Sequence, residues 1–339
     1  MDNEQLLFTV ADRSYFALLK KDIHALAIKM GFNSERAGKV DIVVAELVSN
    51  LVKHANGGHL LVKQIKDNLG GEGIELVSMD NGGGIHDLKR MLQDGISTTN
   101  TLGHGLGSIQ RLSDKCEIYT QKDWGTVILS RLYKDAVINP IKPASKVEIS
   151  TVVIPKPGEE VCGDGVYYKL TKDKLKLFVG DGLGHGPNAA KAINDASHVF
   201  KNSVEDSPVD VIREIHQSVR KTRGLVASVA IFNFKEKVWR ICGVGNIAVK
   251  VQSFLNSKNY VSHNGIIGHN IPNTMKDQLV PYEPNQTLLF CSDGIKTRWE
   301  LYKYPGILKN DLSVLTAALY KDHTRNTDDA SVVAVKINL

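Results

Sequence analysis

The spacing of hydrophobic residues predicts two helices near the start of the chain. Between positions 14 and 30 apolar side chains recur at a helical period, at Leu18, Leu19, Ile23, Leu26 and Met30. Gly31 is suited to end such a helix, which should serve core packing only. A second helix should begin at Asn33 or Ser34, either of which can cap it, and continue to about Ala55. Strand-like stretches follow at 60–65, 74–79 and 127–132.

The second half of the chain is richer in strand-like stretches. They predict strands at 147–154, 166–170, 175–179, 226–234, 238–244, 287–291 and 331–337. Helical spacing returns at 187–202, 208–221 and 310–320. The simplest arrangement places helices on the outer faces of sheets, so the chain is predicted to belong to the α+β class.

A stretch with two prolines separates these halves. Pro140 and Pro143 lack a backbone N–H and bias the residues before them away from helix. We therefore expect a linker at 134–146, between one domain over 1–133 and another over 147–339. A chain of 339 residues is long enough for two domains of ordinary size.

Composition and charge narrow the class of protein. Hydrophobic residues make up 42% and charged residues 23% of the chain, which is typical of a soluble globular protein. The net charge of +5 is spread out without Lys/Arg runs, and no apolar run approaches the roughly 20 residues of a membrane span. The polar start is unlike a signal peptide. We expect a cytosolic protein that binds neither nucleic acid nor membrane, with reduced cysteines.

Three segments of the first half carry residues suited to binding a nucleotide. Glu46 and Asn50 lie one turn apart on the second predicted helix, although such a polar stripe alone is more often merely solvated. Asp80 ends a predicted strand and precedes Asn81 and three glycines, which let the backbone approach a ligand closely. A glycine-rich turn at 103–107 then enters a helix, whose N-terminus favours phosphate.

In this order the segments resemble the motifs of the GHKL ATPases, with Gly125-Thr126 as the last, and residues 91–99 resemble the lid of RsbT-type serine kinases of bacterial stress signalling. The resemblance covers about 5–133 and implies a Bergerat-type α/β sandwich that binds ATP. It implies that Asn50 holds Mg²⁺ on the phosphates and that Asp80 accepts the adenine amino group, supported by Thr126. Glu46 would be the base toward the attacking hydroxyl. The glycines of the lid and phosphate loop would be Gly82, Gly84, Gly103, Gly105 and Gly107.

Acidic residues beside glycines mark the second half. Four segments place a carboxylate at a predicted strand end or turn, at Asp164, Asp181, Asp293 and Asp328. Any one of them is more often an ordinary turn. Carboxylates that converge from distant segments repel one another unless cations neutralise them, and oxygen ligands select Mg²⁺ or Mn²⁺. The set therefore predicts a two-metal site.

The ordered set resembles the SpoIIE-type metal-dependent protein phosphatases, and residues 160–164 resemble their small RsbX-type members. The resemblance covers about 147–339 and implies an α-β-β-α sandwich that hydrolyses phosphoserine or phosphothreonine. Two Mg²⁺ or Mn²⁺ ions would activate a water for in-line attack, which gives Asp164 and Asp181 their catalytic role. The implied metal ligands are Asp164, Asp181, Asp293 and Asp328, with the Gly182 carbonyl completing one coordination sphere.

Three neighbouring residues have a weaker claim to chemistry. Asp329 is the second choice to Asp328 as a ligand. His185 could donate to the leaving oxygen, but a turn or supporting role explains it equally well. Cys162 stands where many relatives carry Ser or Gly, and it is assigned no chemistry.

The two halves resemble opposing enzymes for the same hydroxyl group. The leading hypothesis is a bifunctional switch that phosphorylates and dephosphorylates Ser or Thr on a STAS-domain partner of the anti-sigma-antagonist or stressosome type. In the alternative, the protein is a phosphatase whose N-terminal domain lacks kinase activity. That domain would bind a sigma factor or another partner when it holds nucleotide, or would sense nucleotide.

Overall fold

The computed structural model describes residues 5–12, 16–66, 71–91, 105–135, 145–253 and 256–339. It forms two compact units, which are Met1–Ala144 with Leu301–Lys321, and Ser145–Glu300 with Asp322–Leu339. Both units contain helices and antiparallel sheets, so the predicted α+β class is confirmed. Most of the predicted linker, 136–144, lies outside the described residues. Among those residues, no helix has the length and apolar character needed to cross a membrane.

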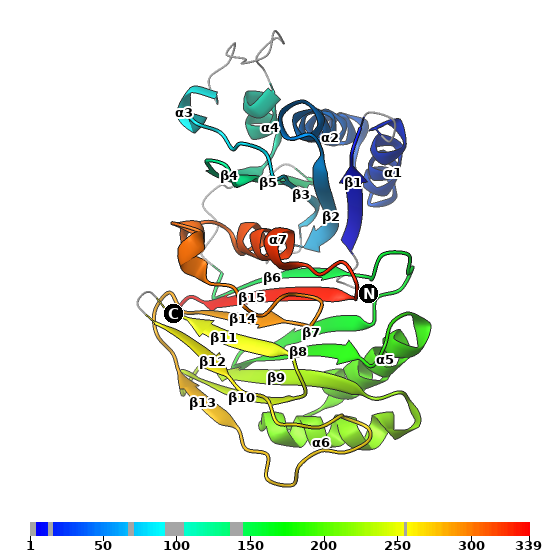
Figure 1. Cartoon of the computed structure of the whole chain (residues 1–339), viewed down its shortest axis with the longest axis vertical. Coiled ribbons are helices and arrows are strands. Elements are labelled where there is room, and N and C mark those ends of the chain that lie inside the picture. The colour runs from blue at the N-terminus through cyan, green and yellow to red at the C-terminus, as the bar shows by residue number, and fades with distance from the viewer. Residues whose placement is uncertain (1–4, 13–15, 67–70, 92–104, 136–144, 254–255) are drawn as a thin grey trace. The chain divides into compact units, whose positions relative to one another are not determined.

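The N-terminal unit has a five-stranded sheet whose helices α1, α2 and α4 share one core with it (Figure 1). The strand order is β1-β2-β3-β5-β4, and every neighbouring pair is antiparallel. The strands are β1 (Gln5–Val10), β2 (Gly58–Lys66), β3 (Glu72–Met79), β4 (Lys115–Gln121) and β5 (Gly125–Tyr133). The helices are α1 (Phe16–Lys29), α2 (Ser34–Ala55), α3 (Leu88–Met91) and α4 (Gly105–Leu112).

Strand β1 was not predicted, because a short apolar run does not distinguish strand from helix until a partner strand is known. Its partner is β2, with Gln5 opposite Lys63 and Val10 opposite Gly58. The helical spacing of α1 was also misread at one position. Leu18 is 57% exposed, whereas Leu19 is buried, since neighbouring positions on a helix point about 100° apart.

Helix α2 begins and ends as its sequence predicts. The Asn33 side-chain oxygen accepts a hydrogen bond from the Arg36 N–H at 2.8 Å, which satisfies a free donor of the first turn. At the other end Asn56 adopts a left-handed conformation with φ of 55°, and its N–H donates to the Leu51 carbonyl. These caps fix the helix that carries Glu46 and Asn50.

Within the N-terminal unit, the segment Leu301–Lys321 is held by a cluster of charged side chains. The Arg131 guanidinium donates to both oxygens of Asp311, at 2.8 and 2.9 Å, and its Nε donates to Glu75 at 2.7 Å. Lys115 also pairs with Asp311, and the Ser313 hydroxyl donates to Glu75 at 3.0 Å. Burial alone would raise the pKa of Asp311, but Arg131 and Lys115 hold it well below its ordinary value.

Replacing Asp311 with alanine should destabilise the N-terminal unit by roughly 2–4 kcal/mol, because Arg131 would stay largely buried with Glu75 as its remaining carboxylate. Since the pKa of Asp311 is lowered in the folded state, its contribution is present above about pH 4 and is lost as the pH falls further. Denaturant unfolding at neutral and acidic pH measures both effects. Glu35→Ala, which breaks the exposed pair with Lys39, is the control and should change little. Equal unfolding free energies for the two variants at neutral pH would contradict the expectation.

The second unit is a sandwich of two five-stranded antiparallel sheets. Their orders are β13-β10-β9-β8-β7 and β12-β11-β14-β15-β6. The strands are β6 (Val147–Ile154), β7 (Asp164–Leu170), β8 (Lys174–Gly182), β9 (Leu225–Asn233), β10 (Val238–Val244), β11 (Ala248–Gln252), β12 (Ser257–Tyr260), β13 (Gln278–Pro281), β14 (Thr287–Cys291) and β15 (Ala330–Ile337). Side chains of both sheets share one apolar core, which includes Phe232, Trp239 and Phe290.

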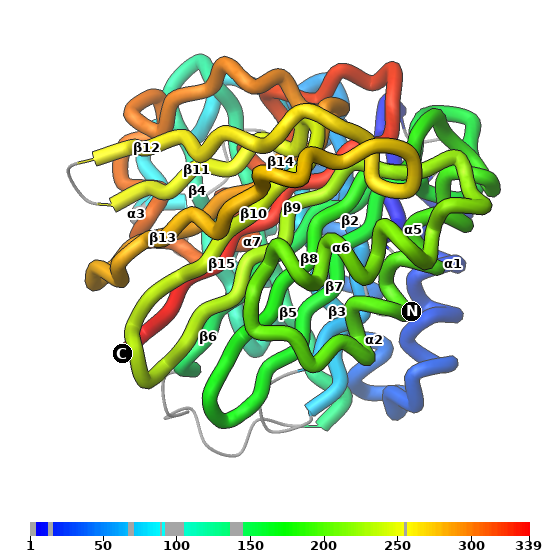
Figure 2. The backbone as a smooth tube through the Cα atoms, turned by 90° about the horizontal axis from the view of Figure 1, so that it is seen from below, coloured from blue at the N-terminus to red at the C-terminus, as the bar shows by residue number. Residues whose placement is uncertain are grey.

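Helices α5 (Pro187–Asn202) and α6 (Pro208–Ser218) cover the outer face of the sheet that contains β7–β10 (Figure 2). A second core, which includes Phe178 and Phe200, fills the space beneath them. The predicted helix at 310–320 appears as α7 (Leu312–His323), whose residues up to Lys321 belong to the N-terminal unit. Strands β11, β12 and β13 were not predicted. They are short, and the exposed β12 has little hydrophobic pattern to reveal it.

Candidate nucleotide and metal sites

The nucleotide residues of α2 face the start of α4. A Cβ atom on Gly105 would lie 3.1 Å from the Glu46 Oε2 and 3.6 Å from the Asn50 Oδ1, so these three predicted site residues lie together. The Asn50 Nδ2 is buried without a hydrogen-bond partner in the described part of the chain. Leaving a buried donor unsatisfied costs about 1–3 kcal/mol, so this amide is suited to a ligand.

Asp80 lies just after β3 and is held by the backbone around it. Its Oδ1 accepts hydrogen bonds from the N–H groups of Gly82 at 2.8 Å and Thr126 at 3.2 Å. Both bonds use one oxygen, which leaves Oδ2 without a hydrogen bond from the residues that the structure describes. Burial raises the pKa of Asp80. The Thr126 hydroxyl lies 3.1 Å from that of Thr120, which fixes the start of β5 beside the carboxylate.

The glycines after Asp80 differ in how much room surrounds them. Gly84 has a φ of +74°, and a Cβ there would lie 2.1 Å from the Gln121 carbonyl oxygen. Gly83 has no atom within 4 Å of its Cβ position. Gly107 is buried within α4, whereas Gly103 and residues 92–99 of the predicted lid lie outside the described residues.

Gly84→Ala should destabilise the N-terminal unit by at least about 1–2 kcal/mol, since it combines a left-handed conformation with a backbone clash. The same change should weaken ATP binding, because the displaced loop begins at Asp80. Gly83→Ala is the matched control and should leave both properties nearly unchanged. Thermal unfolding and nucleotide titration measure them. The interpretation fails if the two alanine variants behave alike.

The predicted metal ligands gather at one end of the second unit. Asp164 and Asp181 are opposite each other on β7 and β8, and Gly182 ends β8. Burial raises the pKa of Asp181, as do the charges of Asp164, Asp293 and Asp328. Burial likewise raises the pKa of Asp164, and the nearby hydroxyls of Ser292 and Ser331 oppose this rise. Its two carboxylate oxygens are buried and have no hydrogen bond of ordinary geometry in the described ranges. Four carboxylates from distant segments therefore lie within electrostatic reach of one another.

These carboxylates have the chemistry of a metal site, but their side chains are not arranged as a complete set of ligands around one point. Among the described residues, no group of three or more His, Cys, Asp or Glu is placed to hold an ion as it stands. Asp293 Oδ2 accepts a hydrogen bond from Asn246 Nδ2 at 2.8 Å instead. The two unpartnered oxygens of Asp164 are nevertheless the kind of donor that Mg²⁺ and Mn²⁺ prefer, and a cation would relieve the mutual repulsion.

The neighbours of this centre support the order of preference between Asp328 and Asp329. Asp329 is 3% exposed, and its two oxygens accept hydrogen bonds from the N–H groups of Lys156 at 2.8 Å and Gly163 at 2.9 Å. It therefore ties two loops together. Asp328 is only half-buried, and its Oδ1 accepts the N–H of Asp329 at 3.0 Å. The less committed carboxylate, Asp328, remains the predicted ligand.

Sequence reasoning missed two residues that orient this centre. Glu159 Oε1 lies 2.6 Å from His185 Nδ1, so the imidazole is held by a carboxylate, and Asn246 holds Asp293. Glu159 and Asn246 each follow a glycine in the sequence, but the sequence does not indicate which residue either side chain contacts. At Cys162, burial together with Asp164 and Asp329 raises the pKa of the thiol, which agrees with the absence of an assigned role.

Polar residues gathered at Glu46 and Asn50 on an α/β sandwich and acidic residues gathered on a β-sandwich mark a two-domain protein of kinase-like and phosphatase type. Two segments of the chain match known families. Residues 9–131 match the histidine kinase-like ATPase domain, and residues 171–338 match the Stage II sporulation protein E (SpoIIE) family. Both predicted resemblances are therefore confirmed.

Three similar proteins illustrate the two parts. The serine/threonine-protein kinase RsbT of Bacillus subtilis (strain 168) is 30% identical over 103 residues, which are 30% of this chain and 77% of RsbT. The phosphoserine phosphatase RsbX of the same organism is 26% identical over 175 residues, 50% of this chain and 87% of RsbX. A solved structure from work on the bacterial stressosome is 28% identical with a TM-score of 0.53, and covers 57% of this chain and 100% of its own.

Proposed function

We propose that this protein is a bifunctional switch that phosphorylates and dephosphorylates Ser or Thr on a STAS-type regulatory partner. The observation that carries the proposal is the presence, in one chain, of an unsatisfied Asn50 amide beside Glu46 and of an unsatisfied Asp164 carboxylate beside Asp181. The first pair suits transfer of a phosphoryl group from ATP, and the second suits its hydrolysis. The similarity to a kinase and to a phosphoserine phosphatase supports opposing reactions on one kind of substrate.

In the N-terminal unit, we propose that Asp80 binds the adenine amino group through its free Oδ2, with Thr126 holding its other oxygen in place. Asn50 would hold the Mg²⁺ that neutralises the nucleotide phosphates. Glu46, one helical turn away, would accept the proton of the attacking hydroxyl. Because Gly105 has no side chain, the start of α4 can approach this pair closely.

In the second unit, we propose that Asp164, Asp181, Asp293 and Asp328 hold two Mg²⁺ or Mn²⁺ ions, together with the Gly182 carbonyl. When bound, the ions would supply Lewis acidity and a nucleophilic water. The chain's own contribution is placement, because the β7–β8 pairing fixes Asp164 opposite Asp181 and Asn246 orients Asp293. The partner would be an anti-sigma-antagonist or stressosome-type STAS protein, in keeping with the stressosome context of one similar structure.

The alternative function, a phosphatase with a nucleotide-binding or nucleotide-sensing N-terminal domain, is favoured by one contact. Lys321 Nζ donates to the Asn81 Oδ1 at 2.7 Å and to the Trp124 carbonyl at 3.1 Å, both within the N-terminal unit. Asn81 directly follows Asp80, and Lys321 lies in the sequence between Asp293 and Asp328. The chain segment between two proposed metal ligands therefore contacts Asn81, the residue next to the proposed adenine-binding Asp80. This is the arrangement that a nucleotide sensor would need.

Assays of phosphate transfer and phosphate removal on one purified STAS protein distinguish the two functions. With labelled ATP and Mg²⁺, the bifunctional switch should transfer phosphate to the partner, and with Mn²⁺ and no ATP it should remove that phosphate. A stable nucleotide-dependent complex with no transfer, together with intact dephosphorylation, would support the alternative instead. If the protein neither transfers phosphate to the partner nor removes it from phosphoserine, the proposal is refuted.

A further inference from the structure

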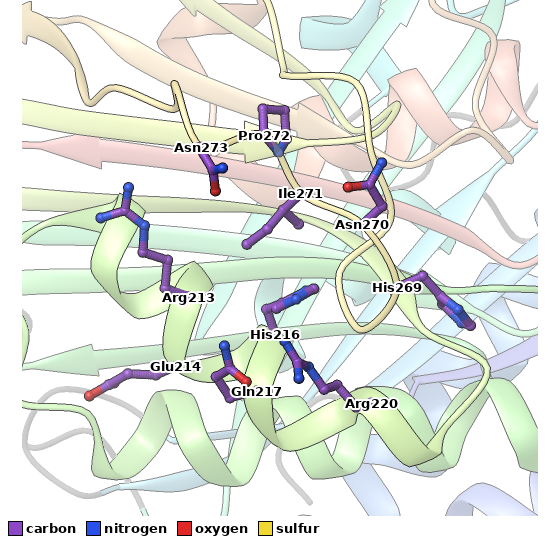
Figure 3. A pocket seen from close by; sticks show the side chains of 10 residues that line it. All are labelled: Arg213, Glu214, His216, Gln217, Arg220, His269, Asn270, Ile271, Pro272 and Asn273. Carbon is purple, nitrogen blue, oxygen red and sulfur yellow. The ribbon is translucent and has the colours of Figure 1, made fainter.

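A concave surface lies on the second unit, beside helix α6 and away from the proposed metal ligands. Helix α6 contributes Arg213, Glu214, His216 and Gln217, and the short 3-10 helix that follows it (Val219–Lys221) contributes Arg220. Residues 269–273 form the opposite wall (Figure 3). The cavity has a volume of about 490 Å³. We call it the α6 groove. None of the proposed metal ligands lines it.

The α6 groove is nevertheless continuous with the loop that carries Asp181 and Gly182. The Leu183 N–H donates to the Gly224 carbonyl at 3.1 Å, and Leu225 forms a β-bridge with Ile267. On the side of the groove, His269 Nε2 donates to the carbonyl of Arg223 at 2.9 Å. Residues 223–225 therefore hydrogen-bond to the metal loop on one side and to the groove wall on the other.

Arg223 adds a cation at this junction. Its Nη1 lies 3.0 Å from the position that a Cβ would take on Gly184, two residues after Gly182. The side chain is exposed. A phosphorylated side chain at the metal centre would therefore have a guanidinium beside it, on the side that leads to the groove.

The groove interior offers a neutral imidazole and a buried carboxylate oxygen as hydrogen-bonding groups. His216 is 7% exposed, and its Nδ1 accepts the Gly268 N–H at 3.0 Å, so Nε2 carries the hydrogen. Burial, Arg220 and His269 lower the pKa of His216, which keeps the ring neutral. Glu214 Oε2 is buried without a hydrogen-bond partner in the described part of the chain.

The two arginines of the groove differ in their pairing. Arg213 Nη1 donates to Asp210 at 3.1 Å, so its charge is partly neutralised. Arg220 is exposed and forms no ion pair with any residue that the structure describes. The amides of Gln217, Asn270 and Asn273 each offer both a donor and an acceptor, as a peptide backbone requires.

We propose that the α6 groove binds the polypeptide segment next to the phosphorylated residue of the phosphatase's protein substrate. A carboxylate side chain of that segment would pair with Arg220, and a backbone N–H would satisfy Glu214. Arg223 would lie where the phosphorylated side chain leaves the metal centre. The inference rests on the proposed phosphatase function and adds to it a site that selects extended, acidic substrates over small phosphate esters.

The test compares three substrates with Mn²⁺ present. They are para-nitrophenyl phosphate, a phosphoserine peptide flanked by glutamates and the same peptide flanked by lysines. Arg220→Ala should lower kcat/KM for the glutamate peptide by about tenfold, mainly through KM, and leave the small ester unchanged. The control is Arg240→Ala, which removes an arginine of strand β10 that pairs with Glu236. Fluorescence anisotropy of the unphosphorylated glutamate peptide should show the same loss of binding without any turnover.

The outcomes separate the groove from the phosphatase itself. Equal turnover of both peptides by the unmodified protein would contradict the proposed role of the α6 groove. Unchanged kinetics and peptide binding in Arg220→Ala would contradict it as well. Equal losses on the small ester and the glutamate peptide would also overturn it, since the effect would then lie at the metal centre. Failure of the unmodified protein to hydrolyse the small ester would refute the phosphatase function instead, and peptide binding would still report on the groove.

Discussion

Replacing Asp181 with asparagine should reduce phosphoserine hydrolysis with Mn²⁺ by at least about a hundredfold. Bound metal ions would supply several kcal/mol of transition-state stabilisation, and Asp181 stands opposite Asp164, another of the proposed ligands. Asparagine keeps the size of the side chain but removes its charge. Initial rates with a phosphoserine peptide at saturating Mn²⁺ measure the effect.

The same variant should change how the protein responds to metal. Burial and the surrounding carboxylates raise the pKa of Asp181, so its charge is unfavourable in the metal-free fold. In chelator the variant should therefore unfold at the same or a higher temperature than the unmodified protein, whereas Mn²⁺ should stabilise only the unmodified protein. Asp173→Asn, at the exposed turn of the same β7–β8 hairpin, should behave like the unmodified protein in both assays. Full activity of Asp181→Asn would remove the basis for the metal site.

Two substitutions on α2 should separate nucleotide binding from phosphoryl transfer. Asn50→Ala should reduce transfer to a STAS partner by about a hundredfold or more and weaken Mg²⁺-dependent ATP binding, because it removes the proposed metal ligand. Glu46→Gln should bind ATP normally but transfer slowly, since the amide cannot accept the proton. Titration with ATP and the rate of label transfer distinguish the two effects.

Gln64→Ala removes an exposed amide from strand β2 and is the control for both substitutions. Transfer at the normal rate by Glu46→Gln would exclude Glu46 as the base. Normal ATP binding by Asn50→Ala would show that the unsatisfied amide has another purpose. If ATP binds to the unmodified protein without transfer, the nucleotide-binding alternative becomes the better account.

The sequence predicted most of the long elements because their signals are local. The cap at Asn33, the left-handed end at Asn56 and the nearly continuous apolar run of β9 depend on residues close by in the chain. Short strands were missed where pairing with a partner matters more than pattern, as in β1 with β2 and β12 with β11. The position of Leu18 was misread because a period alone does not fix which of two adjacent side chains faces the core.

The candidate sites divide in a similar way. Motif order assigned Asp80 and Thr126 to one site and Asp164 and Asp181 to another, and each pair lies together in the structure. It did not indicate that both oxygens of Asp329 bind backbone N–H groups, or that Asn246 holds Asp293. Such partners are distant in sequence, and a hydrogen bond depends on tenths of an ångström that only packing sets.

By itself, the sequence determined the fold class and the two family resemblances, and it proposed the carboxylates, amides and glycines of both candidate sites, because these follow from local periodicity and from motifs in a fixed order. Only the tertiary structure decided that Leu301–Lys321 joins the N-terminal unit, through Arg131, Glu75 and Lys321. It alone revealed the α6 groove. Both features form where segments far apart in the chain come into contact. Such contacts are stabilised by burial and charge pairing between distant residues, which the local sequence does not indicate.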